Sequence, residues 1–202
     1  MDRPVVNLSR VRRALAAPAG GSSDFDLNPG VRRPASRPLR PASVLVPLVE
    51  RGGGLRLMLT RRAALLKHHP GQVAFPGGKQ DAADGTPLAA ALREAREEIG
   101  LRPEDVEVLG HFAVHETVTD FTVTPFVGLV DAGFRPVIDR AEVDEVFEVP
   151  LAFALDPAHL QVHGRVWQGQ MRRYYVIPYG PHYIWGATAR MLKTLSDRMQ
   201  TP

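Results

Sequence analysis

Apolar runs separated by turn residues dominate the middle of the chain. One run covers residues 42–49 and a second covers 55–60, with glycines and charged residues between them. Runs of this length, bounded by turn residues, are typical of buried strands, so we predict a β-hairpin. Apolar stretches at 106–114, 121–130 and 143–149, with prolines and glycines between them, predict three more strands.

A helical pattern replaces the strand pattern over residues 87–99. Thr86 can cap its start, Pro87 suits its first turn, and Gly100 suits a left-handed exit. At about 100° per residue the apolar side chains form one stripe. This stripe comprises Leu88, Ala91, Leu92, Ala95 and Ile99. We therefore predict an amphipathic helix that packs on the sheet.

The two ends of the chain differ in character. Residues 162–167 and 172–178 predict a second hairpin, and 187–199 predict a terminal helix. At the other end, Val5, Val6, Leu8, Val11 and Leu15 have partial helical spacing and predict a short helix. Residues 17–41, rich in Pro, Gly, Ser and Arg, are interpreted as a linker that the fold could spare. The predicted organisation is an N-terminal leader over 1–40 and one α/β domain with a mixed sheet over 41–202.

Charge and composition narrow the classes of function. The chain has a net charge of +3, but residues 1–40 hold eight Arg and three Asp, a net of +5, so the remainder sums to −2. A mobile basic tail explains this better than a nucleic-acid surface, and we expect no nucleic-acid partner. Cysteine is absent, and no apolar run approaches the roughly 18 residues of a membrane helix, so we expect a cytoplasmic protein without a membrane partner.

Three carboxylates gather on the predicted helix beside its apolar stripe. Glu94, Glu97 and Glu98 share one sector, where like charges repel at a cost of a few tenths of a kcal/mol per pair. A solvated acidic face is one explanation. The other is a site for Mg²⁺ or Mn²⁺, which prefer carboxylate oxygens. A preceding glycine turn at 75–78 favours the metal site, since glycine permits close approach of backbone to a phosphate. Arg93 lies one turn before Glu97 and can hold it by an ion pair.

These residues resemble the Nudix box of the Nudix hydrolases, G-x5-E-x7-REUxEExGU, where U is aliphatic. Residues 93–101 match its second half, with small Ala95 at a usually bulkier position. The loop from Gly78 to Arg93 is one residue longer than the general box and lacks the usual glutamate, with Asp84 the nearest acid. The resemblance implies an α/β/α sandwich with a mixed sheet.

The resemblance also implies roles for residues of the box. Hydrolysis of a phosphoric anhydride needs charge neutralisation and a positioned water, and a metal can supply both. Glu94, Glu97 and Glu98 are the candidate metal ligands, joined by the backbone oxygen of Gly78 as the resemblance implies. Arg93, Glu97 and Glu98 are the candidate catalytic residues.

The segment before the box resembles the motif of the coenzyme A pyrophosphatase branch, LLTxR[SA]x3Rx3Gx3FPGG. Met58 stands for a leucine and Lys67 for an arginine, which keeps the charge but loses the bidentate fork. The extra loop residue in the box is common in this branch, and the resemblance extends over residues 42–199. It implies substrate-binding roles in the segment, and the candidates are Thr60, Arg62, Lys67, Gly71 and Phe75.

The expected reaction is metal-dependent hydrolysis of coenzyme A to 3′,5′-ADP and 4′-phosphopantetheine. A Nudix hydrolase for ADP-ribose or a dinucleoside polyphosphate is the alternative, and a noncatalytic Nudix-like binding module is a third. Glu142 or Glu145, in the acidic strand after the box, could supply a base or a further ligand. Trp185 or Tyr183 could stack on an adenine or pack the last helix onto the sheet.

Overall fold

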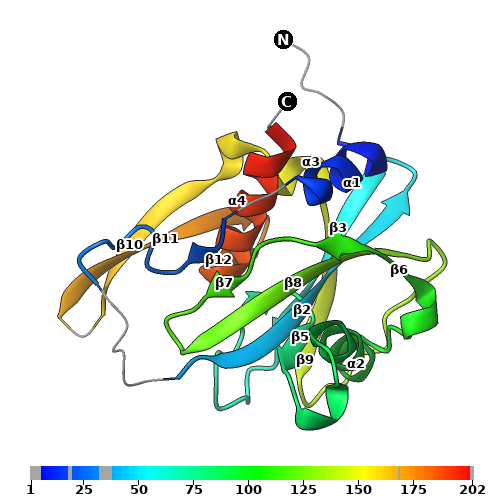
Figure 1. Ribbon diagram of the computed structural model, residues 1–202, viewed down its shortest axis with the longest axis horizontal. Helices are drawn as coiled ribbons and strands as arrows, with labels where there is room; N and C mark the ends of the chain where they lie inside the picture. Colours follow the sequence, from blue (N-terminus) through cyan, green and yellow to red (C-terminus); the bar gives the residue numbers. More distant parts are fainter. Residues whose placement is uncertain (1–5, 18–19, 32–37, 168, 201–202) are drawn as a thin grey trace.

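A mixed sheet forms the centre of the computed structural model, which describes residues 6–17, 20–31, 38–167 and 169–200 (Figure 1). Its long strands are β2 (Arg40–Arg51), β3 (Gly54–Arg62), β8 (Phe121–Val130) and β9 (Val143–Pro150). Its short strands are β1 (Ser22–Ser23), β4 (Val73–Ala74), β5 (Gly77–Lys79), β6 (Val106–His111) and β7 (His115–Glu116). The order along the sheet is β1-β7-β8-β2-β3-β4, while β5 pairs with β2, β6 with β8 and β9 with β3.

Helices and a second sheet complete the described part of the chain. The second sheet is the antiparallel set β10 (Gln161–Trp167), β11 (Gln170–Tyr179) and β12 (His182–Trp185). The α-helices are α1 (Leu8–Ala16), α2 (Pro87–Ile99), α3 (Leu151–Ala154) and α4 (Ala187–Gln200). Short 3₁₀ turns occur at η1 (Ala82–Asp84), η2 (Pro103–Asp105) and η3 (Pro157–His159). None of the described helices has the length and apolar content needed to cross a membrane.

The predicted hairpin and mixed sheet are confirmed. Strands β2 and β3 pair antiparallel with Leu48 opposite Leu57, whereas β2 and β8 run parallel over ten residue pairs. A hairpin needs only a short turn, but a parallel pair needs a long crossover. Helix α2 lies within the crossover between β2 and β8, which is how the central helix comes to cover the sheet.

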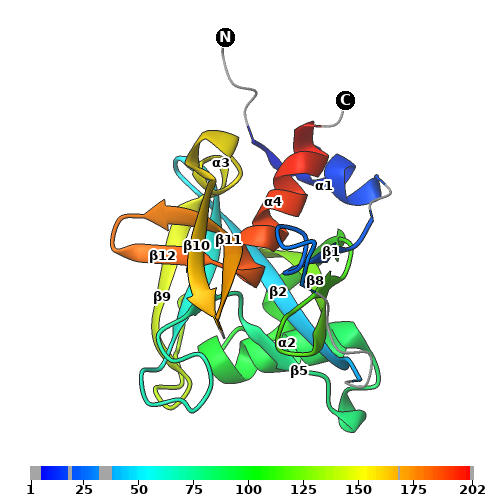
Figure 2. The ribbon, with the colours of Figure 1, turned by 90° about the vertical axis from the view of Figure 1, so that its left-hand side faces the viewer.

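Alternation along β2 sends side chains to two hydrophobic layers. Leu45 and Val49 pack in one cluster with Ala95 of α2. Val46 and Leu48 join the other cluster, which includes residues of α1 and α4. Figure 2 shows α2 on one side of β2 and α1 with α4 on the other. The fold is therefore α/β, an α/β/α sandwich with a mixed sheet, as predicted.

Helix α2 has the predicted ends. The Thr86 hydroxyl accepts a hydrogen bond from the Ala89 N–H at 3.1 Å, and Gly100 takes the left-handed conformation with φ 70°. Ala91 and Ala95 are fully buried. Because these side chains are small, the helix axis can approach the sheet closely, and the carboxylates beside them are brought to the edge of β5.

The strand predicted over 106–114 was too long. Strand β6 ends at His111, and its pairing with β8 shifts register between Val108 and Gly110. Gly110 has φ 144°, a conformation that favours glycine, and it permits the bulge. The later hairpin is confirmed as β10 and β11, with its turn residue Gln168 outside the described residues.

The described part of the leader is packed onto the domain, so the prediction of a mobile tail was wrong there. Val11 of α1 is fully buried, and Arg198 of α4 donates to the Ala14 carbonyl at 2.7 Å. Arg10 donates to the Met199 carbonyl at 2.8 Å. The composition predicted a free arm because arginine is usually exposed. Here Arg10 of the leader instead donates to a carbonyl at the end of α4, and Arg198 of α4 donates to a carbonyl at the end of α1.

The predicted linker also contacts the domain. His115 is fully buried and lies 2.9 Å from the Ser22 hydroxyl and 3.1 Å from an Asp24 carboxylate oxygen. Asn28 exchanges two hydrogen bonds with the backbone of Arg173, at 2.8 and 2.9 Å. Residues 18–19 and 32–37 of this segment lie outside the described residues. Residues 22–28 are thus held against β7 and β11.

Candidate active site

The glycine pair of β5 lies directly against the carboxylates of α2. The Gly77 N–H donates to Glu98 Oε2 at 3.1 Å. A Cβ atom added at Gly77 would lie 2.4 Å from the Ser43 carbonyl oxygen, and one at Gly78 would lie 2.4 Å from Glu94 Cδ. Real Cβ contacts do not occur at such distances. Both positions therefore need glycine. At Gly77 a side chain would collide with the backbone of β2, and at Gly78 a side chain would collide with the Glu94 carboxylate.

Arg93 is the centre of a network that orders the box. Its Nε and Nη2 donate to the two carboxylate oxygens of Asp84 at 2.7 and 3.1 Å. Its Nη1 donates to Glu94 at 3.0 Å and to Glu97 at 2.9 Å. The Nη2 group also donates to the Lys79 carbonyl at 3.1 Å. One side chain therefore connects the box loop to two of the predicted metal ligands.

Asp84 has a different role from the metal ligand that its position in the box loop suggests. Hydrogen bonds from Arg93 and from the Asp81 backbone lower its pKa, and Arg93 in turn has a raised pKa, mainly through Asp84. The Asp84 side chain is only 3% exposed. In the structure this acid positions Arg93, and it reaches Arg93 from a loop that is one residue longer than the general box.

Glu98 is the most deeply buried acid of the site. It is 2% exposed, and Arg62 Nη1 lies 3.6 Å from its Oε1. Burial raises the pKa of Glu98 to about 8, with the charges of Glu94 and Glu142 adding to the effect and Gly77 N–H and Arg62 opposing it. A carboxylate in this position lacks enough positive charge to offset its desolvation.

Glu94 shows the same shortage of positive charge. Burial raises its pKa, the charges of Glu97 and Glu142 add to the rise, and Arg93 opposes it. The donor set of Glu94, Glu97, Glu98 and the Gly78 carbonyl suits a hard divalent cation. In the described residues, no three acidic or histidine side chains already stand as a metal cage. Arg93 occupies Glu94 and Glu97, so a cation would compete with its guanidinium for these oxygens.

Glu142 and Glu145 have different surroundings in the structure. Glu142 acts electrostatically on both Glu94 and Glu98, and its carbonyl accepts from the Ala63 N–H at 2.9 Å. Glu145 instead lies 3.3 Å from Arg61 and 3.7 Å from His182. The geometry therefore favours Glu142 over Glu145 as a residue of the site.

The predicted substrate-binding residues fall into two groups. Thr60 is 1% exposed and donates to the Ala74 carbonyl at 3.2 Å, and Phe75 is 2% exposed within the core. These two side chains shape the loop and are closed to a ligand, contrary to the prediction. Gly71, with φ 68°, closes the loop by donating its N–H to the Arg62 carbonyl at 3.1 Å. Arg62 faces Glu98, and Lys67 is exposed at a neighbouring cavity.

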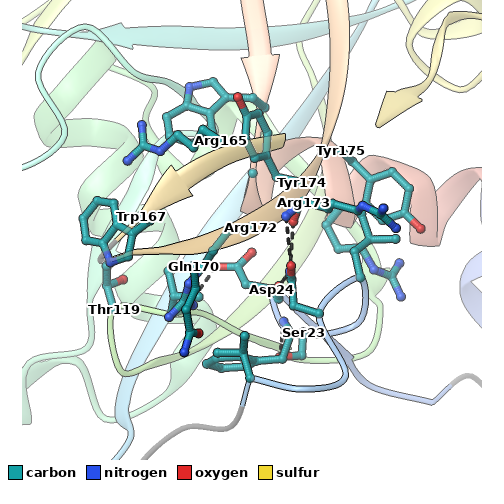
Figure 3. Close-up of a pocket in the computed structure, with 18 of the residues that line it drawn as sticks. Ser23, Asp24, Thr119, Arg165, Trp167, Gln170, Arg172, Arg173, Tyr174 and Tyr175 are labelled. Carbon is teal, nitrogen blue, oxygen red and sulfur yellow. Dashed lines mark hydrogen bonds between the residues drawn. The ribbon is translucent and has the colours of Figure 1, made fainter. Parts of the chain in front are cut away.

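A cavity of about 900 Å³ lies beside this loop, and the sequence reasoning missed it (Figure 3). Its walls come from residues 23–31, 67–69, 118–120, 165–167 and 170–175, together with Trp185 and other residues near it. These segments are far apart in the chain, so no local pattern marks the cavity. The available signal was the density of Arg, Trp and Tyr over 165–175. Trp185 lines the cavity, whereas the Tyr183 hydroxyl lies 2.8 Å from His163 Nδ1.

The fold and the carboxylate helix define a hydrolase of phosphoric anhydrides. The family model described as NUDIX domain matches residues 39–168. A relative from Klebsiella pneumoniae (strain 342), named "Uncharacterized Nudix hydrolase NudL", is 44% identical over 160 residues, which cover 78% of this chain and 81% of the relative. A relative of the same name from Citrobacter koseri is 41% identical over 157 residues, with the same coverage of both chains. The chain belongs to the Nudix hydrolase family.

The chain also has partial similarity to solved structures. The MutT protein from Methanosarcina mazei Go1 has a TM-score of 0.49 and 19% identity, over 84% of this chain and 100% of that chain. The Nudix hydrolase RenU from M. smegmatis has a TM-score of 0.45 and 27% identity, over 55% of this chain and 71% of that chain.

Proposed function

We propose that this Nudix hydrolase cleaves the diphosphate of coenzyme A, giving 3′,5′-ADP and 4′-phosphopantetheine, with Mg²⁺ or Mn²⁺ as cofactor. The observation that carries the proposal is the position of the branch motif. Its Arg62 lies 3.6 Å from the buried Glu98, and its Lys67 is exposed at the adjacent cavity. Cationic groups thus extend from the box toward a space large enough for a substrate.

Glu94, Glu98 and the Gly78 carbonyl are the proposed metal ligands, with Glu97 as the third carboxylate. A divalent cation held there would neutralise charge on the diphosphate and make a water molecule more acidic. Arg93 keeps Glu94 and Glu97 in place, since it contacts both at about 3 Å. The rigid network limits the motion of the carboxylates and so favours one geometry of attack.

The chemical step is attack of water on one phosphorus of the diphosphate. The water oxygen forms a new P–O bond, the anhydride P–O bond breaks, and the other phosphate leaves with the bonding pair. A carboxylate takes the water proton. Glu97, Glu98 and Glu142 are the candidates for this base, and Glu142 is favoured because it lies near the box without an assigned ligand role. Arg62 and Lys67 bind substrate phosphate, Arg62 through its fork and Lys67 as a point charge.

Two other functions make different predictions. Another Nudix substrate, such as ADP-ribose or a dinucleoside polyphosphate, would make the branch motif at 58–78 irrelevant to selectivity. A noncatalytic binding module would bind its ligand without turnover. The set of three box carboxylates is complete, and Arg93 holds Glu94 and Glu97 while the Gly77 N–H holds Glu98, which argues for catalysis.

A substrate panel tests the proposal. The protein is incubated with Mg²⁺ and, separately, coenzyme A, NADH, ADP-ribose and a dinucleoside polyphosphate, and the products are identified. We expect the highest kcat/KM for coenzyme A, and a clear preference for another compound would refute it as the substrate. Glu94→Gln and Glu98→Gln should each lose most activity, whereas Glu104→Gln, an exposed acid outside the box, should not. Normal turnover in both box variants would refute the metal site.

A further inference from the structure

The cavity beside the box has one wall built from the hairpin of the small sheet. Arg165 pairs with Arg172 and Trp167 with Gln170 across β10 and β11. Paired residues of an antiparallel ladder point to the same face, and so do residues two apart. Figure 3 shows these side chains together on the cavity side of the hairpin. The regular pleat of the hairpin therefore places a set of cationic and aromatic side chains on one surface.

The lining is strongly cationic. Among the described residues it contains one lysine and four arginines against two aspartates, and one of the arginines, Arg190, is paired with Asp26. One of these acids, Asp24, is already engaged by His115 and by the Val118 N–H, at 3.1 and 3.0 Å. Arg172 Nε is buried and has no hydrogen-bond partner among the described residues. A buried donor without a partner costs free energy, which an anionic ligand would recover.

Aromatic rings lie next to these charges. The Arg165 guanidinium carbon is 5.0 Å from the Trp167 ring centroid and 5.8 Å from that of Trp185. Tyr174 contacts the Trp185 ring edge to face at 5.3 Å. Trp167 is 46% exposed, an unusual degree for so large an apolar side chain. Stacking surfaces combined with arginines suit a planar base that carries phosphate.

A second wall is the leader segment 23–31, and its position is fixed by contacts with the domain. Asn28 clamps it to the β11 backbone through two hydrogen bonds. Asp26 accepts from Arg190 of α4 at 2.6 Å. The segment is thereby held against β11 and α4 at the side of the cavity. Residues outside the matched family domain of 39–168 thus form part of this cavity.

One loop connects the cavity lining to the box. Lys67, His68 and His69 line the cavity, and the same loop begins at Arg62, which faces Glu98. Burial lowers the pKa of His69, and the positive charge of Arg62 adds to this effect. A diphosphate that contacts Arg62 at the box and Lys67 at the cavity would have one of its substituents on the cavity side.

We propose that this cavity binds the adenosine 3′-phosphate end of the substrate, with the base against Trp167 and Trp185 and the ribose phosphate on Arg165 and Arg172. The inference rests on the proposed function, because it assumes a substrate whose ribose carries a phosphate. It assigns the leader and the hairpin to substrate selection, while the box performs the cleavage.

The test compares the double variant Arg165→Gln/Arg172→Gln with Arg102→Gln, an exposed arginine next to η2 and outside the cavity. For the double variant we expect KM for coenzyme A to rise about tenfold or more, because charge-assisted hydrogen bonds are lost. We expect kcat to stay within about threefold, since the box is untouched. The preference for coenzyme A over the analogue without its 3′-phosphate should disappear. Arg102→Gln should match the wild type in all three measurements.

A direct binding measurement tests the cavity assignment independently of the proposed hydrolysis of coenzyme A. Titration calorimetry with 3′,5′-ADP in EDTA should show about tenfold weaker binding to the double variant than to the wild type. Equal affinity of both proteins, with both folded by thermal melting, would overturn the cavity assignment even if coenzyme A is hydrolysed. Failure of the wild type to hydrolyse coenzyme A, with 3′,5′-ADP binding still dependent on the two arginines, would refute the proposed function and leave the cavity assignment supported.

Discussion

Replacement of Glu98 by glutamine should stabilise the metal-free protein at alkaline pH. The pKa of Glu98 is about 8 in the folded protein, against an ordinary value of 4.5. The folded state therefore holds a proton that the unfolded chain releases at lower pH. Such a group contributes stability fully below about pH 4.5, and this contribution is lost as the pH rises through 8. Charged Glu98 thus destabilises the metal-free fold at pH 9.

The size of the effect follows from the two pKa values. One pKa unit is worth about 1.36 kcal/mol, so the loss approaches about 5 kcal/mol above pH 8. A glutamine at this position avoids the cost and can still accept from the Gly77 N–H, but its amide group places a donor toward Arg62. We therefore expect Glu98→Gln to raise the free energy of unfolding by about 2–3 kcal/mol at pH 9, with little gain at pH 5.

Urea unfolding in EDTA at pH 5, 7 and 9 measures this effect, with Glu97→Gln as the control because the Glu97 side chain is 55% exposed. The control should show no comparable dependence on pH. A gain for Glu98→Gln that is equal at pH 5 and pH 9, or a loss at pH 9, would refute the electrostatic reasoning. Mg²⁺ at 100 times its Kd should largely cancel the advantage of Glu98→Gln at pH 9, because it adds about 2.7 kcal/mol to the protein that binds it.

Three further substitutions test separate parts of the site. Gly78→Ala should leave the fold intact but lower kcat/KM about 100-fold, because its Cβ would displace the flexible end of Glu94, 2.4 Å away; a thermal melt and a rate assay check this. Asp84→Asn should lower kcat about 10- to 100-fold without loss of the fold, since Arg93 loses the charged partner that holds it to the box loop and keeps only Glu94 and Glu97. Asn28→Ala should raise KM for coenzyme A and lower the free energy of unfolding by about 1–2 kcal/mol, as measured by kinetics and urea unfolding.

Each of these three predictions can be contradicted by a specific result. Gly77→Ala should unfold the protein, because its Cβ would meet the Ser43 carbonyl oxygen and the Val44 Cα rather than a mobile side chain. If Gly77→Ala and Gly78→Ala were equally stable in a thermal melt, the different roles assigned to the two glycines would be wrong. Wild-type turnover in Asp84→Asn would show that Arg93 is held without this acid. An unchanged KM in Asn28→Ala would show that the leader wall has no part in substrate binding.

The sequence by itself determined the secondary structure around the box. Thr86 and Gly100 set the ends of α2, and the continuous apolar runs of β2 and β3 identified the hairpin. These signals are local, since a cap or a strand pattern depends on neighbours in the chain. The order of the three glutamates along one helix was equally local, which is why the chemistry of the box could be predicted.

The tertiary structure decided which side chains are accessible and which charges meet. Thr60 and Phe75 belong to the same motif as Arg62, but burial closes the first two and leaves Arg62 facing Glu98. Arg93 is adjacent to Glu94 in the chain, yet its partner Asp84 comes from a loop whose path no spacing rule supplies. The cavity depends on Asn28 reaching β11, a contact across 145 residues. Desolvation and long-range contact both arise only when the chain packs, and they determine the pKa of Glu98 and the walls of the cavity.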